Sequence, residues 1–65
     1  MCNLGDRVKK IRLDNSLTQI EFGKMVCLSQ PHLSSIENNK ERPSKSVIKL
    51  ISVLFHVDES WIVNG

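Results

Sequence analysis

Residues 17–37 decide the fold of this chain, and they read LTQIEFGKMVCLSQPHLSSIE. Near the start of this stretch, Thr18 precedes Glu21 with the spacing of a capping box. In such a box the threonine side chain satisfies a free backbone N–H of a helix, and the glutamate returns a bond to the threonine backbone. The pattern therefore predicts a helix over residues 18–26.

A second helix is expected after a very short connection. Ser29 offers its cap, and Leu33 and Ile36 give it an apolar side, which indicates a helix over residues 29–38. A connection this short makes two helices cross steeply instead of lying antiparallel.

The rest of the chain is also helical in pattern. Leu4, Val8 and Ile11 form one apolar stripe, and Ser44 precedes a longer one. Further helices are therefore predicted over residues 3–15, 44–55 and 58–63. No alternating run of β-branched residues indicates a strand. The expected fold is all-α, a compact bundle of five short helices, and its length suits a single domain over residues 1–65.

Composition limits the class of protein. Hydrophobic residues make up 40% of the 65 residues, which is enough for one core. The longest apolar run, from Met25 to Leu28, is too short for a membrane span, and no signal peptide is visible. Cys2 and Cys27 are too few for the disulfide framework of a small secreted protein, which indicates a reduced, cytoplasmic chain. The net charge of +2 permits a polyanionic partner without requiring one.

The sequence offers little for metal or catalytic chemistry. Cys2, Cys27, His32 and His56 are residue types that bind zinc, but their spacing fits no zinc motif, so we expect no metal and no cofactor. The sequence has no nucleophile paired with a base, no paired carboxylates for acid–base chemistry and no phosphate-binding glycine loop. We therefore predict that the chain is not an enzyme.

One face of the helix expected over residues 29–38 has an unusual surface. The side chains turned away from its apolar stripe are Gln30, Pro31, Ser34, Ser35 and Asn38. These groups carry no charge, whereas solvated helix faces are rich in Lys and Glu. Such a face suits the DNA major groove, where short polar groups reach base edges. A serine-rich surface without a partner is the alternative.

In combination, these features resemble the Cro/repressor-type helix-turn-helix family, also called the XRE family. The similarity covers nearly the whole chain and is carried by Leu17–Gln19, Phe22, Gly23, Val26, Leu28–Gln30, Leu33, Ile36–Asn38, Pro43 and Trp61–Gly65. It implies a lambda repressor-like DNA-binding domain whose recognition helix is the one at 29–38. It also implies a sequence-specific regulator of double-stranded DNA, a repressor of phage or prophage type, that acts as a homodimer on an inverted-repeat operator.

The resemblance assigns DNA contacts residue by residue. Base contacts fall on Gln30, Pro31, Ser34 and Ser35, and contacts to the DNA backbone fall on Gln19, Ser29, His32, Asn38, Asn39, Lys40 and Arg42. The chemistry agrees, since glutamine can pair with adenine through two hydrogen bonds and Pro31 can offer apolar contact to a thymine methyl. For the loop at 38–42, a solvated surface is the alternative.

Arg12 and Glu37 have a different expected role. Each lies one turn beyond an apolar residue, Val8 or Leu33, and so falls beside a core stripe. The resemblance joins them as an ion pair between the first and third helices. We interpret this pair as structural, because it would position the recognition helix.

Three positions depart from the family pattern, which usually has glycine there: Cys27, Asn39 and His56. Such places tend to need a positive φ. Asn and His tolerate this conformation better than most residues other than glycine, whereas Cys27 is less suited to it.

Pro31 leaves two alternatives for the start of its helix. In the first, Ser29 caps the helix through the N–H of His32, and Gln30 is mildly strained because it precedes a proline. In the second, the helix begins at Pro31, since the first helical position favours proline.

A second function also stays open, namely a protein-interaction module on the same scaffold. An antitoxin whose surface over residues 29–42 holds a partner protein would be one example. Trp61 has two interpretations, core packing or a share in a dimer interface. The final Asn64 and Gly65 fit either a complete small regulator or a domain cut from a longer chain.

Overall fold

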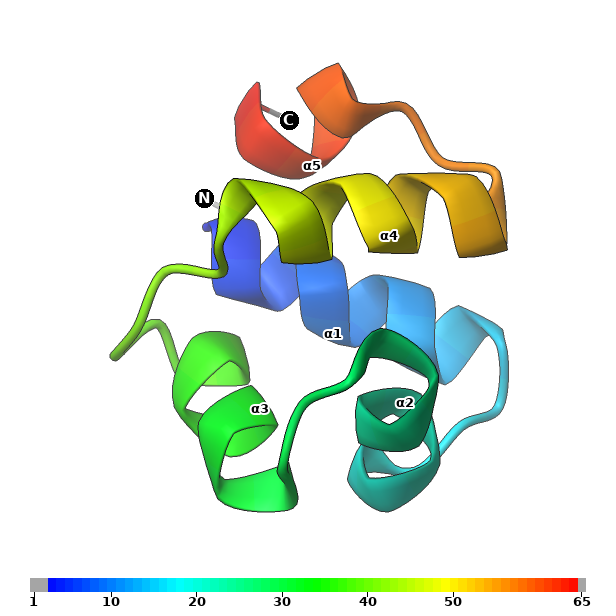
Figure 1. Cartoon of the computed structure of the whole chain (residues 1–65). Helices are drawn as coiled ribbons and strands as arrows, with labels where there is room; N and C mark the ends of the chain where they lie inside the picture. Colours follow the sequence, from blue (N-terminus) through cyan, green and yellow to red (C-terminus); the bar gives the residue numbers. More distant parts are fainter. Residues whose placement is uncertain (1–2, 65) are drawn as a thin grey trace.

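The computed structural model describes residues 3–64, and that range contains five helices and no strand (Figure 1). They are α1 (Leu4–Asp14), α2 (Gln19–Val26), α3 (Gln30–Glu37), α4 (Lys45–Phe55) and α5 (Glu59–Asn64). The predicted all-α fold is confirmed, and each helix begins and ends within about one residue of its expected bounds. In the described part of the chain, no helix has the length and apolar character needed to cross a membrane.

The helices begin where side chains cap them. Thr18 Oγ1 accepts a hydrogen bond from the backbone N–H of Glu21 at 3.1 Å, and Glu21 Oε1 accepts one from the N–H of Thr18 at 2.9 Å. The bond from the Thr18 backbone is the main reason that the pKa of Glu21 lies below its ordinary value. Ser29 and Ser44 cap α3 and α4 through their side-chain oxygens.

Side chains from every helix meet in one core. Figure 1 shows α4 and α5 above α1, with α2 and α3 below. The buried apolar residues between them are Val8, Ile11, Phe22, Val26, Leu33, Ile36, Ile48, Ile51 and Ile62. The rings of Phe22 and Phe55 stack with centroids 5.3 Å apart and join α2 to α4. Trp61 packs against this core and is partly buried.

The turn between α2 and α3 depends on Gly23. A Cβ on this residue would lie 2.5 Å from the carbonyl oxygen of Leu28, which is too close for any larger residue. The N–H of Leu28 donates to the Gly23 carbonyl at 2.7 Å. Glycine thus lets the chain fold back against the end of α2 and begin α3 after a short turn.

Four residues other than glycine have a left-handed backbone within residues 3–64, with φ between 55° and 61°: Ser16, Cys27, Asn39 and His56. The last three are the positions where a positive φ was expected, and that prediction is confirmed. Ser16 was not foreseen, and it lies in the turn after α1. An L-residue in this region costs on the order of 1 kcal/mol.

Pro31 lies inside the first turn of α3. Ser29 Oγ accepts a hydrogen bond from the N–H of His32 at 3.4 Å, and the helix begins at Gln30. Of the two alternatives for the start of this helix, the structure has the one in which Ser29 provides the cap.

Candidate nucleic-acid interface

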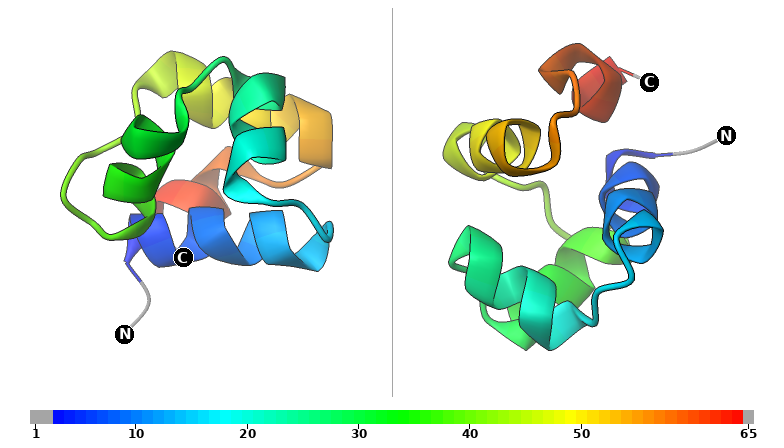
Figure 2. Two further views of the ribbon diagram at one scale, coloured as in Figure 1. Left: turned by 90° about the horizontal axis from the view of Figure 1, so that it is seen from below. Right: turned by 90° about the vertical axis from the view of Figure 1, so that its right-hand side faces the viewer.

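The candidate interface is formed by α3 and the loop that follows it, and the left view of Figure 2 looks onto the molecule from the side of α2 and α3. We call it the α3–loop surface. It comprises Gln30, Pro31, His32, Ser34, Ser35, Asn38, Lys40, Glu41 and Arg42. All of these residues are exposed except Ser34 and Ser35, which are partly buried.

A buried ion pair fixes α3 against α1. Arg12 is only 9% exposed and Glu37 only 5% exposed. The guanidinium donates to both carboxylate oxygens, from Nε at 2.7 Å and from Nη2 at 3.1 Å, and its Nη1 donates to the carbonyl of Leu17 at 2.9 Å. The ion pair expected between the first and third helices is therefore present. Its two parallel bonds hold the helices in one relative orientation.

Gln19 belongs to the same network. Its side-chain amide donates to Glu37 Oε1 at 3.2 Å. The family resemblance assigned this residue to a DNA phosphate, whereas here its amide supports the ion pair. The phosphate contact stays a prediction. Because the Gln19 amide is bonded to Glu37, a phosphate at this place would instead contact backbone N–H groups in the first turn of α2.

The residues expected to contact bases lie on one side of α3. Gln30 and Pro31 are exposed at its start, and Ser34 and Ser35 follow one turn later on the same face. Asn38 Nδ2 donates to Ser34 Oγ at 3.3 Å. This face presents amide, hydroxyl and apolar groups without a formal charge.

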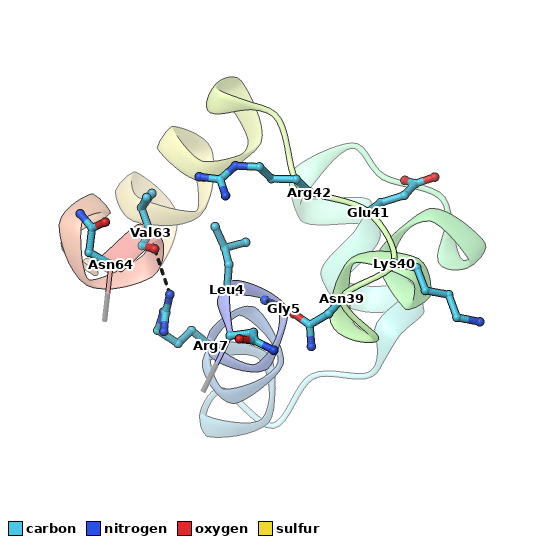
Figure 3. A pocket seen from close by; sticks show the side chains of 10 residues that line it. Leu4, Gly5, Arg7, Asn39, Lys40, Glu41, Arg42, Val63 and Asn64 are labelled. Carbon is cyan, nitrogen blue, oxygen red and sulfur yellow. Dashed lines mark hydrogen bonds between the residues drawn. The ribbon is translucent and has the colours of Figure 1, made fainter. Parts of the chain in front are cut away.

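The loop after α3 carries two exposed cations, Lys40 and Arg42. The N–H groups of Lys40 and Glu41 donate to the carbonyl of Ser35 at 2.9 and 3.3 Å, so the loop begins by folding back on α3. Pro43 is buried where the loop ends. Figure 3 shows the two cationic side chains directed to opposite sides of the loop, Arg42 toward Leu4 and Val63 and Lys40 away from them.

The side chain of Asn39 is directed to α1. Its Oδ1 accepts a hydrogen bond from the N–H of Gly5 at 3.0 Å, and its Nδ2 donates to Asp6 Oδ1 at 3.3 Å. The DNA-backbone contact assigned to Asn39 stays a prediction, and a contact through its side chain would have to compete with these bonds.

Glu41 is a residue of this surface that the sequence did not point to. Its carboxylate lies 2.8 Å from His32 Nε2, and both side chains are about half exposed. The contact is an ion pair only when His32 is protonated. The histidine expected to touch a phosphate therefore has a carboxylate partner in the free protein.

The residues considered as zinc ligands do not form a described cluster. Cys2 lies outside the described residues, and Cys27 is exposed in the turn between α2 and α3. Across residues 3–64, no group of three or more His, Cys, Asp or Glu side chains gathers in a way that could hold a metal ion.

Comparison with protein families agrees with this geometry. A family model described as helix-turn-helix matches residues 8–62, which include α2, the turn and α3. The chain belongs to the helix-turn-helix family. The resemblance drawn from the sequence is thereby confirmed.

Three curated proteins are similar to this helix-turn-helix chain. An immunity repressor protein of Bacillus phage phi105 is 32% identical over 60 residues, which cover 92% of this chain and 42% of the repressor. The ImmF control region 10 kDa protein of the same phage is 34% identical over 55 residues, which cover 85% of this chain and 61% of that protein. Antitoxin PezA of Streptococcus pneumoniae serotype 4 is 35% identical over 60 residues, which cover 92% of this chain and 38% of the antitoxin.

The matched region is thus less than two thirds of each of these helix-turn-helix relatives. A search of the solved structures found no match.

Proposed function

We propose that this chain binds double-stranded DNA sequence-specifically and represses transcription as a homodimer on an inverted-repeat operator. The observation that carries the proposal is the uncharged face of α3, which the buried pair of Arg12 and Glu37 holds in one orientation. A helix with short polar side chains and no negative charge can enter the major groove and bond to base edges. The similarity to a phage immunity repressor supports this function.

Within this proposal, the contacts divide into two kinds. Gln30, Pro31, Ser34 and Ser35 contact bases, and the proposed backbone contacts are Gln19, Ser29, His32, Asn38, Asn39, Lys40 and Arg42. Gln30 is the first residue of α3, and its amide can bond to N6 and N7 of one adenine. Lys40 and Arg42 are exposed and can each neutralise a phosphate.

A homodimer is part of the proposal because one short helix reads few base pairs. Two copies related by a two-fold axis place their recognition helices in major grooves about 34 Å apart. Val53 and Leu54 on α4 are 62% and 40% exposed, and they lie outside the α3–loop surface. A second copy can therefore cover apolar surface on α4 while α3 remains free.

Selection from a random duplex library, followed by sequencing of the bound pool, tests this function. We expect an enriched inverted repeat whose half-sites are about ten base pairs apart, centre to centre. Affinity for it should fall as salt rises, because bound phosphates release counterions. No enrichment would contradict sequence-specific binding, and a site without two-fold symmetry would contradict the dimer.

The match to an antitoxin favours a second candidate function, in which the surface at residues 29–42 holds a protein partner. Salt-dependent duplex binding with a base preference supports the first function. A tight protein partner in the absence of duplex binding supports the second. Neither function includes a catalytic step.

A further inference from the structure

Asn39 joins the end of α3 to the beginning of α1. Figure 3 shows it next to Gly5, on the same loop as Lys40, Glu41 and Arg42. The Asn39 side chain accepts from the N–H of Gly5 at 3.0 Å and donates to Asp6 at 3.3 Å. One amide thus uses both its acceptor and its donor on the first turn of α1. We call these two bonds the Asn39–α1 contact.

The close approach of these segments is built into the backbone. Gly5 is buried, and a Cβ on it would lie 2.1 Å from the carbonyl oxygen of Ile36 and 2.6 Å from Asn39 Oδ1. Any residue larger than glycine would therefore force α1 away from the end of α3. Asn39 itself has a φ of 61°, where glycine would fit with less strain. Asparagine tolerates this backbone better than most residues, and its side chain adds two bonds that glycine lacks.

The Asn39–α1 contact lies directly before the cations of the loop. Lys40 follows Asn39, and the N–H groups of Lys40 and Glu41 are bonded to the Ser35 carbonyl. The start of the loop is thus held from two directions, by α3 through Ser35 and by α1 through Asn39. Without the bonds to α1, this point of the loop keeps its bonds to α3, including the one from the Asn39 N–H to the Ile36 carbonyl at 3.0 Å.

We propose that Asn39 is a positioning residue, which holds the start of the loop so that less of its backbone must be ordered when Lys40 and Arg42 meet DNA phosphates. This role rests on the proposed DNA-binding function. Ordering a loop at an interface costs free energy, and a loop that is already fixed avoids part of that cost.

Asn39→Gly tests the proposal, because glycine accepts the left-handed backbone and removes only the side-chain bonds. His56→Gly is the matched control, since it also replaces a left-handed residue with glycine. His56 lies at the C-terminal end of α4. The measurements are exchange of the Gly5 amide hydrogen without DNA, and affinities for the selected duplex and a scrambled duplex over a salt series.

For Asn39→Gly we expect faster exchange of the Gly5 amide and about two- to ten-fold weaker binding to both duplexes, the equivalent of one hydrogen bond. The slope of log affinity against log salt should become shallower by about one for each phosphate that the variant no longer binds. His56→Gly should leave all three quantities unchanged. Faster exchange with unchanged affinity and salt slope would overturn the proposal, as would an equal weakening of binding in His56→Gly.

An exchange of side chains between positions 6 and 39 gives a second test. Asn39→Asp alone places two carboxylates together. Asp6→Asn alone leaves one side-chain oxygen for two donors, because Asp6 also accepts from the N–H of Asn3 at 3.2 Å. In the double variant, the amide at position 6 can serve Asn3 with its oxygen and the carboxylate at position 39 with its NH₂ group.

Asp6→Asn should therefore strengthen DNA binding when position 39 is Asp more than it does when position 39 is Asn, a comparison in which the loss of the Asp6 charge cancels. Equal effects of Asp6→Asn in the two backgrounds would overturn the positioning role. If the unaltered chain binds no duplex, the proposed function fails and the positioning role fails with it. If the unaltered chain binds and every variant matches it, only the positioning role fails.

Discussion

The Arg12 guanidinium and the Glu37 carboxylate face each other across α1 and α3, joined by two hydrogen bonds of 2.7 and 3.1 Å. Additional bonds connect Arg12 to the Leu17 carbonyl and Glu37 to the Gln19 side chain. The pair therefore ties together the first helix, the start of the second and the end of the third. Loss of either partner would leave the other charge buried without its counterpart.

Arg12→Ala and Glu37→Ala should each lower the free energy of unfolding by about 3–5 kcal/mol, because each leaves an unpaired buried charge. The double variant should lose less than the sum of the two, since both changes remove the same interaction. Urea unfolding of the three variants measures this. Lys10→Ala is the control, because its bond to Asp14 joins two side chains that are each 61% exposed and should contribute little. Similar small shifts in all variants would contradict a structural role for the buried pair.

Gln30→Ala should separate base reading from phosphate binding. We expect it to weaken the preferred duplex by about 1–3 kcal/mol and to leave a scrambled duplex nearly unchanged, since the amide would bond to a base. Lys40→Ala or Arg42→Ala should instead weaken all duplexes alike and reduce the salt slope by about one for each phosphate left unbound. Affinities for both duplexes over a salt series measure these effects. Equal weakening of both duplexes by Gln30→Ala would make Gln30 a phosphate contact and leave base reading to Ser34 and Ser35.

Cys27→Gly should stabilise the fold. Cys27 ends α2 with a φ of 61°, and glycine relieves the contact between Cβ and backbone that makes this region costly. The larger conformational freedom of glycine in the unfolded chain offsets part of the gain, so we expect about 0.5–1 kcal/mol. Thermal unfolding under reducing conditions gives the comparison. A lower midpoint would show that the Cys27 side chain contributes packing that outweighs the strain.

Glu21→Gln should change the pH dependence of stability. The pKa of Glu21 is lowered in the folded chain, chiefly by the hydrogen bond from the Thr18 backbone. Stability from this carboxylate is therefore fully present above its unfolded-state pKa and is lost as the pH falls through its folded-state pKa. The difference in unfolding midpoint between the unaltered chain and Glu21→Gln should be largest near neutral pH and shrink in acid. A difference that stays constant across this range would contradict the assignment.

Much of the fold could be predicted from the sequence because the signals are local. Thr18, Ser29 and Ser44 mark helix starts, and each acts on a backbone N–H three residues away. The positive φ of Asn39 could be predicted because the family usually has glycine at this position. The buried pair of Arg12 and Glu37 could be expected only through the resemblance, since no local spacing joins two helices.

The partners within the candidate site could not be predicted in this way. Glu41 contacts His32 only because the loop folds back on α3. Asn39 contacts Gly5, which lies 34 residues earlier in the sequence. The resemblance assigned Gln19 to a DNA phosphate, and it gave no sign that the Gln19 amide donates to Glu37 on another helix. These contacts depend on the path of the chain in three dimensions, which periodicity and capping do not specify.

The left-handed junctions described above also affect how long a copy of the chain survives. Each of these left-handed residues lowers the free energy of unfolding. That free energy is small to begin with, because a chain of 65 residues can bury only a limited apolar surface. A partner that binds only the folded form restores about 2.7 kcal/mol when it is present at 100 times its Kd. Bound copies then open far less often than free ones and offer proteases fewer chances to cut them. Free copies should therefore be cut faster than copies bound to such a partner.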